Sequence, residues 1–296
     1  MNLQELINST NSVKGRGQNS VFQKKFGSIY AFNKRVDIIE NGNAISISMI
    51  IGGVTDMIKV GGKRTPVPFH RVALALNVGK DGKKEYTSDQ LVSEIRMRHK
   101  KYADEKEWPK PDILKEVLNA PDKFFDNATV FQKVNGKKWV VVTNNIPIES
   151  EVQVWCSCSD YYWTFEYYNI NHKNRDGSSI NLYPSASLRY PKTYNRKSGS
   201  RIPVRNPGRH PGMCKHLMLL VAMLMKDEVI KDPKTGLLKA YKADYATFLR
   251  DKQKQRIKQS AYADMMKKYN EGLKILRSQR NTAHIQRGDK EEKRKS

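Results

Sequence analysis

Three cysteines in 296 residues stand in a pattern that restricts how this chain can fold. Cys156 and Cys158 form a C-x-C pair in the segment VWCSCSDYYW, and Cys214 and His216 form a C-x-H pair in PGMCKHLMLL. An odd number of cysteines argues against a disulfide framework. Free or metal-bound thiols indicate a reducing compartment, so we expect a cytoplasmic protein.

The two pairs have the spacing needed to meet at one metal ion. Cys156 and Cys158 lie two residues apart on a predicted strand, so both side chains can face one point. Residues two apart in a regular helix point to nearly opposite sides, so Cys214 and His216 must straddle the turn into the apolar helix that follows. The N-terminus of that helix favours a thiolate at Cys214.

Three thiolates and one imidazole make the closed tetrahedral ligand set of a structural zinc ion. We therefore predict one Zn²⁺ per chain, with a structural role, since four protein ligands leave no open position for water. Two alternatives stay open. The four residues could be ordinary core residues, and His210 lies only four residues before Cys214 as a rival ligand. His216 is preferred because it completes the C-x-H pair.

The pattern resembles the SWIM zinc finger, which joins C-x-C and C-x-H through a variable spacer. The segment CSCSDYYW is similar to the family's C-x-C-x-D-aromatic, and CKHLMLL is similar to its C-K-H-apolar-apolar. The spacer of 55 residues is long for the family, and Leu219 stands where the family often has alanine. The resemblance covers about residues 152–226 and implies a module that binds DNA or protein. A fainter resemblance, on a few residues before the C-x-H pair, is to SWIM-type proteins of large tailed phages.

The rest of the chain predicts an α+β fold. Asn41-Gly42, Asp81-Gly82 and Asn135-Gly136 each separate apolar runs and suit tight hairpins, so the region 28–143 should be rich in antiparallel strands. One helix should begin at a Ser88 cap, with Leu91, Ile95 and Met97 facing inward. A second should begin at Pro111 and end before Pro121.

The metal-binding region should be a zinc-stapled ββα module. A strand at 152–158 is followed by a second strand at 163–168, a long irregular loop at 172–212 and a buried helix after the C-x-H pair. Beyond it, apolar residues recur at helical spacing from Ile257 to Leu276. The predicted organisation is a flexible polar and basic arm at 1–27, an α+β domain at 28–150, the SWIM-like module with its basic insert at 151–230, and a basic helical tail at 231–296.

The formal net charge of +24 predicts a polyanionic partner, most commonly nucleic acid. No acidic residue lies between Asp176 and Asp227, so the loop within this stretch is a basic insert. Its prolines and Gly199 favour an extended strap over a helix. Basic side chains can neutralise phosphates, and tyrosines can stack on unpaired bases. The predicted nucleic-acid contacts are Arg189, Tyr190, Lys192, Tyr194, Arg196, Lys197, Arg201, Arg205 and Arg209. The alternative is a solvated loop with a chance charge bias.

Three classes of function follow. The first is a zinc-containing protein that binds DNA in preference to RNA. The second is a virion or assembly component of a phage, whose charge meets packaged DNA or an acidic protein partner. The third is a metal-dependent nuclease built from carboxylates such as Asp37, Glu40, Glu94 and Asp112, although no phosphate loop or hydrolase motif is present. No membrane partner is expected, because the longest apolar run, Leu217–Met225, is far shorter than the ~20 residues that span a bilayer.

Overall fold

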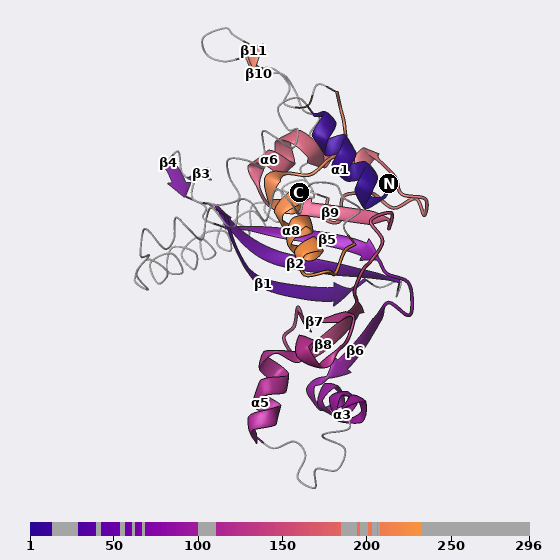
Figure 1. The fold of residues 1–296 in the computed structure, drawn as a ribbon. Helices are drawn as coiled ribbons and strands as arrows, with labels where there is room; N and C mark the ends of the chain where they lie inside the picture. The colour runs from indigo at the N-terminus through magenta and orange to yellow at the C-terminus, as the bar shows by residue number, and fades with distance from the viewer. Residues whose placement is uncertain are drawn as a thin grey trace, which may run out of the picture.

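The computed structural model describes residues 1–13, 29–39, 43–53, 57–60, 63–66, 69–99, 111–184, 194–195, 201–202, 206 and 208–231. The described residues form a mixed α+β structure around a seven-stranded sheet (Figure 1). The sheet order is β6-β8-β7-β1-β2-β5-β9. Two small hairpins stand apart from this sheet, β3 (Met57–Val60) with β4 (Lys63–Pro66), and β10 (Tyr194–Asn195) with β11 (Arg201–Ile202). The predicted helical tail lies outside the described residues, except for residue 231.

Two of the three predicted hairpin turns do separate antiparallel neighbours. Strands β7 (Ala128–Lys133) and β8 (Lys138–Thr143) pair around Asn135-Gly136, where Gly136 has a φ of +74°. Strands β1 (Ile29–Ile38) and β2 (Ala44–Gly53) also pair antiparallel, and Asn41-Gly42, which comes between them in the sequence, lies outside the described residues.

The predicted Asp81-Gly82 hairpin is wrong. Strand β5 (Phe69–Asn77) pairs with β2 and β9 (Val152–Cys156), whereas β6 (Lys83–Thr87) crosses to the opposite edge and pairs with β8. The reason is that the two strands serve different cores. The buried face of β5 lies in the main hydrophobic cluster, while Tyr86 on β6 packs against a second cluster.

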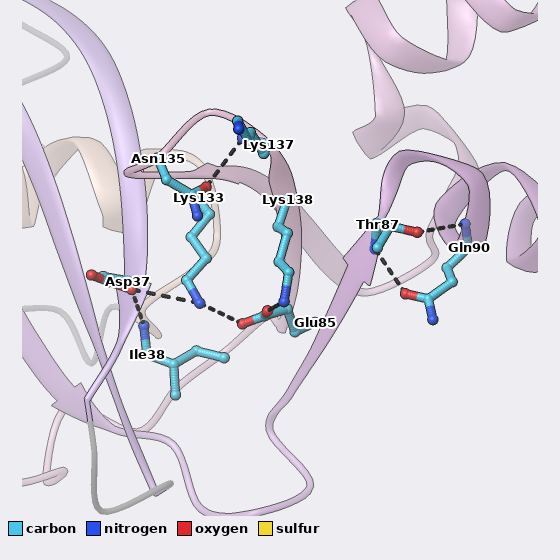
Figure 2. A network of polar contacts seen from close by, with 9 residues as sticks. All are labelled: Asp37, Ile38, Glu85, Thr87, Gln90, Lys133, Asn135, Lys137 and Lys138. Atoms are coloured by element: carbon cyan, nitrogen blue, oxygen red, sulfur yellow. Dashed lines mark hydrogen bonds and ion pairs between the residues drawn. The ribbon is translucent and has the colours of Figure 1, made fainter.

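A short parallel pairing joins the two halves of the sheet. Strands β1 and β7 share the pairs Arg35↔Gln132 and Val36↔Lys133. Lys133 also crosses this junction with its side chain. Its Nζ lies 2.7 Å from Glu85 Oε2 and 3.9 Å from Asp37 Oδ1, and Lys138 Nζ lies 2.6 Å from Glu85 Oε1 (Figure 2). Glu85 therefore links β6 to β7 and β8 through two lysines.

We expect Glu85→Gln to destabilise the fold by about 1 kcal/mol or less, because partly exposed ion pairs contribute little. Hydrogen bonds from Lys133 and Lys138 lower the pKa of Glu85. The ion pairs therefore stabilise the fold above the unfolded-state pKa of about 4.3, and this contribution is lost as the pH falls through the folded-state value. Urea unfolding should show a difference between variant and wild type at pH 7 that shrinks on acidification. A difference that persists at low pH would contradict the assignment.

The second cluster lies under helices α3 (Ser88–Arg98) and α5 (Pro111–Asn119), next to β6–β8 (Figure 1). The sequence predicted both helices, with two errors. The cap of α3 is Thr87 and not Ser88, because Thr87 and Gln90 form a reciprocal capping box. Met97 was predicted to face inward but is 74% exposed. Val92 is buried instead, together with Leu91 and Ile95.

The first residues of the chain are not a flexible arm, as predicted for 1–27. Residues Leu3–Ser12 form helix α1, which a capping box between Asn2 and Glu5 begins. Leu3, Leu6 and Ile7 recur on one face and are buried in the main cluster. The polar composition of the segment led to the wrong prediction. Three apolar residues on one stripe are enough to dock a short helix, even when the other residues are polar. Residues 14–28 lie outside the described part.

The main cluster fills the space between the buried face of β1, β2, β5 and β9 and the helices that cover it (Figure 1). Helix α8 (Lys215–Lys226) is the central element of this layer and is buried on almost every side, as its apolar sequence predicted. Strand β9 lies beyond the predicted boundary at residue 150, yet it pairs with β5 over Val152–Cys156. The C-x-C pair therefore begins at the edge of the same sheet that the N-terminal strands build.

Candidate metal centre

Cys156 and Cys158 lie at the junction between a strand and a helical segment. Cys156 is the last residue of β9 and points to its buried face, as Val152 and Val154 do. Cys158 follows the strand and precedes a run of helical turns, α6 (Ser159–Tyr161), η3 (Tyr162–Glu166) and α7 (Tyr167–Asn171). The Cys158 sulfur accepts a hydrogen bond from the Tyr161 backbone N–H at 3.2 Å, as a helix cap does.

The second strand that the sequence predicted at 163–168 is therefore wrong, and the centre is not a ββα module. Tyr161 and Phe165 are four residues apart and fully buried, which places them on one helical stripe. The aromatic residues of this segment are typical of strands. Burial of the Tyr161–Phe165 stripe in the main cluster outweighs that preference.

Cys214 and His216 straddle the start of a helix, as predicted. Cys214 is the N-cap of α8 and has extended backbone angles, φ −76° and ψ 170°. His216 lies in the first helical turn and is completely buried. The change from extended to helical backbone between the two residues turns both side chains to the same side, which a regular helix would not do.

All four side chains converge. The sulfurs of Cys156, Cys158 and Cys214 and one ring nitrogen of His216 lie within 4.8 Å of one another, and all four residues are buried. His216 Nδ1 is 3.8 Å from Cys156 Sγ and 4.0 Å from Cys214 Sγ. Zinc–ligand bonds of about 2.0–2.3 Å in tetrahedral geometry would place such atoms roughly 3.6 Å apart. The most separated donor atoms would therefore have to approach each other by about 1 Å to close the set around a metal ion.

The charge balance of the three thiols also suits a cation. Burial raises the pKa of Cys156 and of Cys158. Burial opposes ionisation of Cys214 as well, but hydrogen bonds from the other two thiols outweigh it and hold the Cys214 pKa well below its usual value. The cluster thus favours one thiolate at the start of α8, and full ionisation of all three sulfurs requires a positive ion among them.

A buried polar network holds the two ligand-bearing segments together. The Asn169 side chain donates to Gly212 O at 2.9 Å and accepts from Gly212 N at 2.8 Å, two residues before Cys214. It also donates to the Tyr161 hydroxyl, which in turn donates to Val154 O on β9. Asn169 and Tyr161 are fully buried. Through these two residues, the helical segment after Cys158, strand β9 and the turn before α8 form one hydrogen-bonded unit.

Other neighbours of the centre gave no clear signal in the sequence. His70 on β5 is buried, and its ring centroid lies 4.6 Å from that of His216. Thr10 of helix α1 accepts a hydrogen bond from Met213 N at 2.9 Å. Both residues are more than 140 positions from the C-x-H pair, so only the folded topology brings them there. The rival ligand His210 is not in the cluster.

The predicted nucleic-acid contacts lie almost entirely outside the described side chains. Arg209 is described, and it is exposed with a φ of +57° in the turn that leads to the C-x-H pair. Tyr194 and Arg201 are described only as backbone, in the β10–β11 hairpin. The remaining residues of the set, Arg189, Tyr190, Lys192, Arg196, Lys197 and Arg205, lie outside the described part.

The carboxylates considered for a nuclease site do not gather in the described part of the chain. Asp37 lies 3.9 Å from Lys133, and Glu94 pairs with Arg98 at 2.7 Å. The side chains of Glu40 and Asp112 are not described. Within the described ranges, the Cys₃His set is the one group of three or more His, Cys, Asp or Glu residues with metal-binding geometry.

No family model matches the chain, and the searches of curated proteins and of solved structures found no significant match. Among the described residues, none of the helices has the length and apolar character needed to span a membrane.

Proposed function

We propose that this chain binds one zinc ion through Cys156, Cys158, Cys214 and His216, and that the metal has a structural role. The observation that carries the proposal is the convergence of four buried donor atoms from two distant segments. Three sulfurs and one imidazole nitrogen are soft to borderline ligands, which favours Zn²⁺ over Mg²⁺ or Ca²⁺. The resemblance to the SWIM finger supports the same ligand set.

The zinc would tie the end of strand β9 to the start of helix α8 inside the main hydrophobic cluster. The loop between the two ligand pairs spans 55 residues, and a metal that closes such a loop contributes its binding energy to folding. A centre with four protein ligands keeps no open position, so we infer no catalytic role for the ion.

We further propose that the protein binds nucleic acid, and DNA in preference to RNA. Support comes from the net charge of +24 and from the acid-free stretch between Asp176 and Asp227, which holds the long insert. The start of the insert lies against β9, where the Leu182 N–H donates to Val154 O, and the insert ends in the turn just before Cys214. The metal centre would therefore anchor the base of a cationic strap, which neutralises phosphates without reading bases.

Zinc content of the purified protein tests the metal proposal directly. We expect about one zinc per chain by elemental analysis of protein never exposed to chelators. Acidification should release the ion, because protons compete with the metal for three thiolates and one imidazole. Less than a few tenths of a zinc per chain, with no uptake on addition of zinc to the reduced protein, would contradict the proposal.

A further inference from the structure

Helix α1 bridges the two segments that carry the metal ligands. At its start, the backbone N–H groups of Leu3 and Gln4 donate to Ser150 O and Ile148 O, just before β9. Near its end, the side chains of Ser9 and Thr10 bind the turn before α8. The helix therefore contacts both the segment that leads into β9, the strand that ends in Cys156, and the turn that leads to Cys214.

The contacts at the turn fix its backbone residue by residue. Ser9 Oγ donates to Pro211 O at 2.7 Å, and the Met213 backbone N–H donates to Thr10 Oγ1 at 2.9 Å. The Thr10 hydroxyl hydrogen is directed to Leu6 O at 2.7 Å, so its oxygen is free to accept from Met213. Thr10 and Met213 are both buried, so loss of this bond would leave the Met213 N–H without a partner inside the protein.

Close packing on two sides restricts the position of the turn. A Cβ atom on Gly212 would lie 2.6 Å from a ring carbon of Phe165 and 3.1 Å from Thr10 Oγ1. The turn is thus pressed between α1 and η3, and only glycine allows this approach. Any outward movement of α1 releases the peptide groups next to Cys214, and any displacement of the turn removes the partner of Thr10.

From these contacts we infer that metal binding and docking of α1 are coupled, with Thr10 as a positioning residue for the metal centre. The inference rests on the proposed zinc site. Residues that orient metal ligands without touching the ion typically change affinity by about 10- to 100-fold. Coupling is reciprocal, so the factor by which docked α1 tightens zinc binding is the factor by which zinc tightens α1 docking.

Thr10→Val tests the coupling, because valine keeps the shape of threonine and removes the acceptor for Met213. We expect zinc affinity, measured by competition with a chromogenic chelator on the full chain, to fall about 10- to 100-fold. Thr10→Ser keeps the hydroxyl and should retain most of the wild-type zinc affinity. Val117→Ala, in the second hydrophobic cluster, should lower overall stability and leave zinc affinity unchanged.

Hydrogen exchange on the wild type provides a readout that needs no variant. Removal of zinc should lower the protection of α1 residues 6–12 far more than that of α3. Unchanged α1 protection in the zinc-free protein, or unchanged zinc affinity in Thr10→Val, would overturn the coupling while the zinc proposal stands. If the wild type binds no zinc at all, the proposed function itself fails and this inference falls with it.

Discussion

Replacement of Cys158 by serine is expected to reduce zinc affinity by more than about 100-fold. Changes to residues that only orient a metal ligand cost about 10- to 100-fold, and loss of a ligand should cost more. At saturating zinc, a 100-fold loss alone removes about 2.7 kcal/mol of stability, because the ion binds the folded and not the unfolded chain. Chelator competition and urea unfolding in the presence of zinc measure the two quantities.

The loss should be local before it is global. We expect hydrogen exchange in Cys158→Ser to rise first in α8 and in the region 152–226, which the metal ties together. The second cluster, under α3 and α5, should keep its protection, since its residues are separate from the cluster that contains the cysteines. Equal loss in both clusters would mean that the sheet and its two cores unfold as one unit.

A chelator supplies the matched control for this variant. Zinc removal should destabilise the wild type more than Cys158→Ser, and the two proteins should become nearly equal in stability without zinc, because the substitution and the chelator act on the same ion. If the chelator destabilises both proteins equally, the sulfur of Cys158 acts in packing and not in metal binding.

The sequence predicted the convergence of the Cys₃His cluster better than it predicted the surroundings of the cluster. The four residues stand in two short pairs, and the spacing within each pair is informative because the side-chain positions follow from local backbone geometry. Cys214 and His216 behave in this way, since the transition from extended chain to helix at Cys214 alone brings them to one side. The strand predicted at 163–168 was wrong because its aromatic residues favour a strand locally, whereas burial of Tyr161 and Phe165 on one stripe favours the helix.

Contacts between distant segments were not predictable from local pattern. The Asp81-Gly82 turn has hairpin chemistry, yet β5 and β6 separate because they pack on different clusters. Helix α1 was missed because its few apolar residues do not by themselves indicate a buried helix. They are buried only because distant segments, the one before β9 and the turn before α8, pack against the helix. The buried hydrogen bond between Thr10 and Met213 links residues 203 positions apart. The local sequence around either residue does not indicate this partner.

A fourfold substitution in the basic insert should weaken DNA binding for unrelated sequences alike. The variant replaces Arg196, Lys197, Arg201 and Arg205 with glutamine, and none of them is a metal ligand, so zinc content should stay unchanged. If each side chain neutralises one phosphate of duplex DNA, the slope of log affinity against log salt should become less steep by about 3.6. Fluorescence anisotropy with two unrelated labelled duplexes, over a range of salt concentrations, measures both effects.

A second fourfold variant separates a binding strap from the general charge of the molecule. Lys80, Lys84, Lys115 and Lys137 are exposed and lie outside the insert. Their replacement by glutamine lowers the net charge from +24 by the same four units. If the insert is the contact, this control should retain most of the affinity and the salt slope, since charges beyond the Debye length of about 8 Å are screened at physiological salt.

The comparison of the two variants decides between three mechanisms. A loss confined to the insert variant, equal for both duplexes, supports phosphate contacts by the strap. A loss for one duplex only would show that the insert reads bases, and a purely electrostatic role would be wrong. Equal losses in both variants would make binding a property of the whole charge distribution. If the wild type binds neither duplex even at low salt, the DNA-binding proposal fails, and a charge of +24 points to an acidic protein partner.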